Sequence, residues 1–177
     1  MKKLLKDITK SVLLEHEKKG EEFVDEVTYS SYAVPVMQLL LASKRLKRKT
    51  KRKLQLILLK IPADSVDMKQ VSDPSQECLK HVESMMSDNV GSNMLEAIVR
   101  SSDEDLYYFL YLHFFRGKVR KLSAKVPPTF VLQSLISSAK TDVHFNLIFD
   151  ELTQEKDFSE FFCKLQFPFP FFGILTF

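Results

Sequence analysis

The sequence predicts an all-α fold, a right-handed α-solenoid of three-helix repeats. One pattern recurs three times along the chain, and internal repetition with a period of about 20–50 residues is typical of solenoids. Apolar residues follow helical spacing through most of the chain. The 177 residues include only 4 Gly and 7 Pro, which is too few for an all-β fold built on many tight turns.

The recurring pattern lies in residues 32–41, 88–99 and 127–136. Each copy opens with a small or turn-forming residue and two variable positions. Two apolar residues follow, then a Gln or Glu, one variable position and two more apolar residues. The Gln or Glu is Gln38, Glu96 or Gln133, so the spacings are 96 − 38 = 58 and 133 − 96 = 37 residues.

The first 43 residues predict three helices. Residues 1–19 form an amphipathic helix that ends near Gly20, after two lysines that suit a helix C-terminus. A short helix over 21–27 leads into the first repeat helix, at about residues 31–43. Pro35 fits only the first turn of a helix, which places the start near Val34.

A basic block follows over residues 44–53, in which eight of the ten side chains are Lys or Arg. Residues 54–61 predict an apolar helix that stops at Pro62, and residues 62–73 predict a linker. Because the first spacing exceeds the second by 58 − 37 = 21 residues, the stretch 44–73 is interpreted as an insertion between repeats. The block itself has three interpretations: contact with RNA phosphates, a nuclear or nucleolar address, or a solvated loop.

The second half predicts two further repeats over residues 74–155. Asp73-Pro74-Ser75-Gln76 is a helix start in which Asp73 is the expected cap. The central repeat helix is expected over 92–99. An aromatic core helix over 106–115 follows, capped by residues 102–105. Later helices are expected over 118–125, 129–138, 141–152 and 155–165.

Residues 156–177 are expected to form an irregular tail rich in Phe and Pro. Residues 167–177 carry no charge and show no periodicity. A natural surface rarely exposes such a stretch. It is interpreted as a truncated end that replaces further repeats, or else as a plug over the open end of the stack.

Composition and motifs argue against several classes of function. The net charge of +3 does not by itself indicate nucleic-acid binding. No signal peptide and no apolar run long enough to span a membrane occur in the sequence. Cys78 and Cys163 suit two neutral thiols in a reducing compartment. No glycine-rich phosphate loop, catalytic set or ligand spacing among the four histidines is found, so we expect neither an enzyme nor a metal or cofactor site.

The polar positions of each repeat helix suggest a binding surface. Each Gln or Glu lies four residues after a variable position, so the two share one helical face. If the helices stack in parallel, these pairs form a ladder on one concave surface, and one helical repeat per base is a known mode of RNA recognition. The residue after the variable position is Pro35, Asn93 or Phe130, which would lie between bases. The alternatives are a solvated helix face or a protein-binding scaffold.

These copies resemble Pumilio (PUF) repeats, and their amino-acid sequences are most similar to the nucleolar protein 9 family. The resemblance covers residues 21–155 and implies Pumilio/armadillo-like three-helix repeats that bind precursor ribosomal RNA in the nucleolus during small-subunit biogenesis, without catalysis. Ser92 with Glu96 resembles a guanine-reading pair. The family has more repeats than three, so the chain would be a fragment. The RNA-binding residues that the resemblance implies are Gln38, Ser92, Asn93, Glu96, Thr129, Phe130 and Gln133.

Two basic clusters are candidates for phosphate contacts. The partners that the resemblance implies are RNA and pre-ribosomal proteins, with no membrane contact, and the chain is expected to be a monomer in the nucleus and nucleolus. The rival hypothesis is a HEAT- or armadillo-like scaffold that binds protein without RNA. The candidate phosphate contacts are Lys44, Arg45, Lys47, Arg48, Lys118, Arg120 and Lys121.

Overall fold

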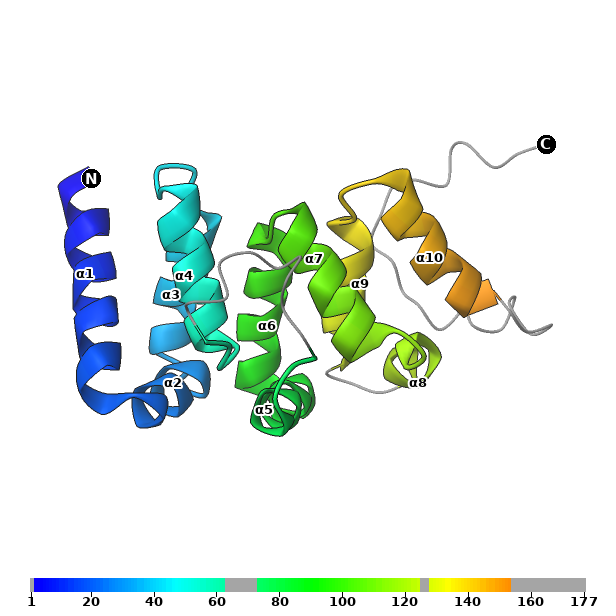
Figure 1. Ribbon diagram of the computed structural model, residues 1–177, viewed down its shortest axis with the longest axis horizontal. Helices are drawn as coiled ribbons and strands as arrows, with labels where there is room; N and C mark the ends of the chain where they lie inside the picture. The colour runs from blue at the N-terminus through cyan, green and yellow to red at the C-terminus, as the bar shows by residue number, and fades with distance from the viewer. Residues whose placement is uncertain (1, 63–72, 125–127, 154–177) are drawn as a thin grey trace.

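The structure is a computed structural model that describes residues 2–62, 73–124 and 128–153. All regular structure in these ranges is helical, which confirms the all-α fold (Figure 1). The elements in chain order are α1 Lys2–Lys19, α2 Glu21–Thr28, α3 Ala33–Ala42, α4 Arg48–Leu58, α5 Gln76–Ser87, α6 Asn89–Ser101, α7 Glu104–Leu110, the π-helix η1 Tyr111–Phe115, α8 Val119–Ser123, α9 Pro128–Ser137 and α10 Asp142–Thr153.

After α1, the helices repeat in threes. Each repeat has a short helix (α2, α5, α8), a motif helix (α3, α6, α9) and a closing helix (α4, α7 with η1, α10). Figure 1 shows the closing helices in front of the motif helices and the short helices along the lower edge of the molecule. The predicted three-helix period is therefore confirmed.

Side-chain caps set the starts of three helices. The Asp88 carboxylate accepts from the backbone N–H of Val90 and Gly91, so α6 begins three residues before the predicted Ser92. The prediction for α5 was wrong in its cap: Ser75, not Asp73, accepts from the Cys78 N–H. A capping side chain must lie two or three residues before the N–H that it accepts from, and Ser75 has that spacing.

The predicted aromatic helix is confirmed as core, although its second half is the π-helix η1 rather than α-helix. Tyr107, Phe114 and Phe115 are among the largest fully buried side chains. The buried Tyr107 hydroxyl donates to the carbonyl of Leu135 at 2.7 Å, which ties the second repeat to α9 of the third. Burial raises the pKa of Tyr107 well above its usual range.

The basic block differs from the expected insertion, because its second half is the start of α4. This helix takes the closing position in the first repeat, as α7 and α10 do in the others (Figure 1). A run from Leu54 to Leu59 is buried, which anchors the helix in the core. Arg52 is also buried, so one member of the basic block is part of the packed interior rather than a solvated loop.

Several expectations lie outside the described residues: much of the linker after Pro62, the helix over 155–165, the tail over 167–177 and Cys163. Within the described ranges, Cys78 is a buried free thiol, as expected. Across the same ranges, no helix combines the length and the apolar character that a membrane crossing requires.

Candidate nucleic-acid interface

The three motif helices lie side by side, with α6 between α3 and α9. The α3–α6 contact is called the first seam and the α6–α9 contact the second seam. Tight packing of α6 depends on Gly91: a Cβ there would lie 3.0 Å from the Cα of Met85 on α5 and 3.0 Å from the ring of Tyr29. The small residue before the variable position therefore brings the motif helix close to its short partner helix.

At the first seam, Gln38 of α3 reaches across to α6. Its side-chain Nε2 donates to the backbone carbonyl of Asn93 at 3.0 Å. The acceptor is a carbonyl, so the amide nitrogen must face the seam and the amide oxygen remains for another partner. Asn93 is exposed, and its own Nδ2 donates to the carbonyl of Asn89 one turn earlier.

At the second seam, Glu96 of α6 is held by two partners. Its Oε2 accepts from Nη2 of Arg100 at 3.0 Å and from the Ser134 hydroxyl on α9 at 3.0 Å. Nε of Arg100 donates to the same Ser134 oxygen at 3.1 Å, which closes a three-membered polar network. Ser134 is fully buried, whereas the Arg100 side chain is 63% exposed. The network therefore runs from the interior of the seam to the surface.

On α9, two of the predicted RNA-binding residues are partly exposed, and the third links α9 to α8. Phe130 is 50% exposed, so one ring face can stack on a planar group. Gln133 is half-buried, and among the described residues its amide has no hydrogen-bond partner recorded. The Thr129 hydroxyl donates to the Ser123 carbonyl at 3.1 Å, so it links α9 to the end of α8.

The first variable position of the motif is more deeply buried than the sequence suggested. Ser92 is 2% exposed, and its hydroxyl donates to the carbonyl of Asn89 in its own helix. Val34, at the same position of α3, is equally buried. In this geometry the edge-reading pair predicted on α6 is largely covered: Ser92 is buried and the Glu96 side chain is 14% exposed. Periodicity places a residue on a face, but it does not say how closely the neighbouring helix covers that face.

The two basic clusters do not form one surface. Lys44, Arg45 and Lys47 are exposed near the connection from α3 to α4, whereas the other cluster lies on and just before α8, in the third repeat (Figure 1). Lys118 pairs with Glu83 of α5 at 2.9 Å. The exposed side chain of Lys121 lies on α8. Any phosphate contacts by these groups would therefore be made at separate places.

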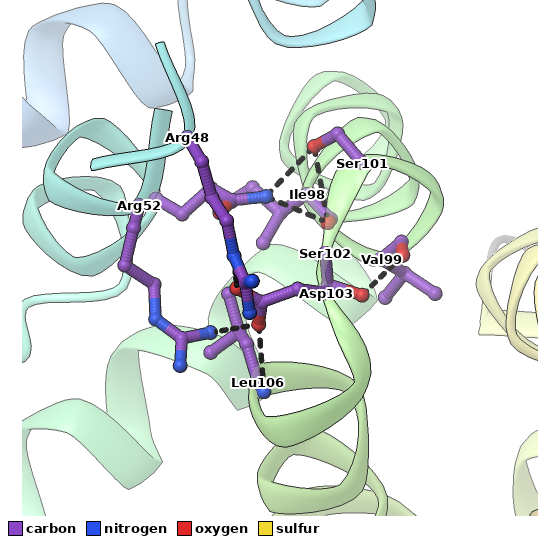
Figure 2. Close-up of polar contacts among 9 residues, drawn as sticks. Arg48, Arg52, Ile98, Val99, Ser101, Ser102, Asp103 and Leu106 are labelled. Atoms are coloured by element: carbon purple, nitrogen blue, oxygen red, sulfur yellow. Dashed lines mark hydrogen bonds and ion pairs between the residues drawn. The ribbon is translucent and has the colours of Figure 1, made fainter. Parts of the chain in front are cut away.

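Arg48 belongs instead to a clamp between the first and second repeats (Figure 2). Asp103 accepts from Nε of Arg48 at 3.1 Å and pairs with the buried Arg52, while it also caps α7 through the Leu106 N–H. Next to it, Nε2 of Gln55 donates to the Ser101 hydroxyl at 2.8 Å. No local sequence pattern indicates this clamp, because Asp103 lies more than 50 residues from both arginines.

Cys78 is a buried thiol in the described part of the chain. Burial, together with Glu77, raises the pKa of Cys78 to about 11, so its thiol is protonated at neutral pH. No group of three or more His, Cys, Asp or Glu side chains within those ranges could hold a metal ion.

Comparisons with known proteins agree with the helical-repeat fold. Residues 1–159 match the NOP9-like PUF repeat domain. Nucleolar protein 9 of Debaryomyces hansenii is 30% identical over 118 residues, which are 65% of this chain and 15% of that protein. A solved structure described as APUM23-deletion-of-insert-region-GGAAUUGACGG gives a TM-score of 0.59 at 22% identity, over 74% of this chain and 24% of that one. That likeness shows the fold alone, and this chain spans a small part of either relative.

Proposed function

Because the chain belongs to the NOP9-like PUF repeat domain family, we propose that it binds single-stranded RNA along its motif helices, one base per repeat. The observation that carries the proposal is the alignment of α3, α6 and α9, which brings polar motif residues to each seam. On α9, the exposed ring of Phe130 and the neighbouring Gln133 offer a stacking surface and a hydrogen-bonding group.

We propose precursor ribosomal RNA as the target, and the nucleolus as the site of action, during small-subunit biogenesis. Support comes from the family and from the name of the similar protein, Nucleolar protein 9. Pre-ribosomal proteins are the second class of partner. In this proposal the chain acts by binding and carries out no reaction.

The test is equilibrium binding of the purified chain to a single-stranded RNA pool at two salt concentrations. The variant Phe130→Ala, Gln133→Ala removes one stacking ring and one amide from the exposed side of α9. Since stacking of a base on an aromatic ring contributes about 1–3 kcal/mol, affinity should fall on the order of tenfold or more. The melting temperature should change little, because neither side chain is fully buried.

Ser137→Ala on the exposed end of α9 is the matched control and should bind like the parent chain. Salt-sensitive RNA binding by the parent chain that is lost in the double variant would support binding on the motif helices. Salt-sensitive binding that survives the double variant would place RNA on the basic clusters instead. No RNA binding at either salt concentration would contradict the proposal.

A second candidate function is protein binding, which one observation favours. Tyr32, Val36 and Leu39 form an exposed apolar stripe at helical spacing on and just before α3, and Phe145 and Phe149 stack on the surface of α10. Exposed apolar patches of this kind are typical of protein contacts. Binding of a protein partner that is insensitive to salt and lost with Leu39→Glu would favour this scaffold function.

A further inference from the structure

The second seam contains a side chain that the repeat pattern does not include. Arg100 lies one turn after Glu96 on α6, and the equivalent residues are Ala42 on α3 and Ser137 on α9. Only α6 therefore carries a cation at this position among the three motif helices. A Glu followed four residues later by Arg is a stable pair on a helix surface.

The pair is also tied to the next repeat, which separates it from an ordinary surface ion pair. Ser134 is fully buried and donates its hydroxyl proton to Oε2 of Glu96, and it accepts from Nε of Arg100. Both polar contacts to Glu96 thus fall on one carboxylate oxygen. The other oxygen, Oε1, takes part in none of the hydrogen bonds recorded within the described ranges.

From this geometry we propose that Arg100 is a specificity-determining residue of α6. It holds Oε2 of Glu96 in the seam, so that α6 offers one carboxylate oxygen to the base that faces it. A single acceptor pairs with one N–H donor. A free carboxylate, by contrast, can accept from two adjacent donors, such as the N1 and N2 groups on the edge of guanine. Arg100 acts here through Glu96, as a positioning residue. The inference rests on the proposed RNA binding.

The experiment compares base preferences of the parent chain and of Arg100→Met, using a randomised single-stranded RNA pool of about ten nucleotides, sized for a few bases read singly by the repeats. Bound RNA is sequenced at several protein concentrations. We expect Arg100→Met to raise the preference for guanine at one position on the order of tenfold, because Oε2 then keeps only its contact with Ser134 and the carboxylate can turn to offer both oxygens to the two N–H donors of guanine. Preferences at the positions read by the other repeats should stay the same.

Two further variants identify the cause. Glu96→Gln in the Arg100→Met background should abolish the new guanine preference, since an amide has one acceptor oxygen. Lys80→Gln, on the exposed side of α5, removes the same charge away from the motif helices and should leave base preferences unchanged. A Tm close to that of the parent chain would show that Arg100→Met folds, and Arg100→Gln provides a second variant if it does not.

Three results would overturn the inference. If Arg100→Met weakens all sequences equally and lowers the salt dependence by about one counterion, Arg100 contacts a phosphate rather than positioning Glu96. If base preference is unchanged, the seam network has no role in recognition, while the proposed function still stands. If the parent chain enriches no sequence and binds no RNA, the proposed function fails and this inference fails with it.

Discussion

At the scale of single residues, Asp103 joins the first repeat to the second. Its carboxylate caps α7, accepts from Arg48 and pairs with Arg52 (Figure 2). The two arginines differ in environment: the Arg52 side chain is 10% exposed and the Arg48 side chain 77% exposed. Exposed ion pairs contribute little to stability, whereas removal of one partner from a buried pair leaves an uncompensated charge.

Arg52→Met and Arg48→Met should therefore have different effects on the free energy of unfolding. We expect Arg52→Met to lower it by about 2–4 kcal/mol, since Asp103 loses its buried partner. Arg48→Met should lower it by about 0–1 kcal/mol. Urea denaturation followed by circular dichroism measures both. Equal destabilisation by the two variants would contradict the role given to burial.

At the scale of elements, α6 is the helix on which the stack depends, because it packs against α3, α5 and α9. Its sequence combines the Asp88 cap with Gly91 at the closest approach to α5. A glycine inside a helix normally costs about 1 kcal/mol relative to alanine. Here the small residue permits a close approach, because a Cβ would lie only 3.0 Å from the backbone Cα of Met85.

Gly91→Ala should consequently destabilise the protein although alanine favours helix. We expect a net loss of about 1–3 kcal/mol, because α5 must move to admit the methyl group and backbone yields less readily than side chains. Thermal unfolding checks this, with Lys80→Ala on the exposed face of α5 as the control, expected to change stability by less than about 0.5 kcal/mol. A more stable Gly91→Ala variant would mean that the α5–α6 contact is looser than described.

At the scale of the whole molecule, the central repeat has more neighbours among the described helices than the repeats on either side of it. The central repeat contacts neighbours on both sides, through the Asp103 clamp on one and the Tyr107–Leu135 bond on the other. By contrast, α1 packs mainly against α2. In stacked repeats each unit gains stability from its neighbours, so local stability should follow position in the stack.

Hydrogen exchange read by mass spectrometry should show this gradient. We expect peptides from α6 and α7 to exchange most slowly and peptides from α1 and α10 to exchange fastest, because among the described helices α1 and α10 pack against fewer neighbours than α6 does. The Arg52→Met variant should speed exchange in α4 more than in α9. Uniform protection along the chain would indicate instead that the repeats open as one cooperative unit.

Much of the fold was predictable because the signals are local. The starts of the helices near Pro35, Asp103 and Pro128 follow from caps and proline positions in the sequence. The basic block was harder to interpret, because its charge pattern describes a solvated surface and its packing depends on distant Asp103. Likewise, the motif spacing put Ser92 and Glu96 on one face, but the depth of Ser92 depends on how the helices pack around α6.

The amino-acid sequence by itself determined most of the helices, their grouping in threes, the aromatic core and the family, because periodicity, caps and repeated motifs are properties of neighbouring residues. Tertiary structure alone decided which atoms of the motif face a seam and which face outward. Gln38 donates a hydrogen bond to the carbonyl of Asn93, 55 residues away in sequence, and Glu96 accepts one from Ser134, 38 residues away. Such contacts depend on how whole helices pack against each other, and no local pattern records the angle and depth at which they meet.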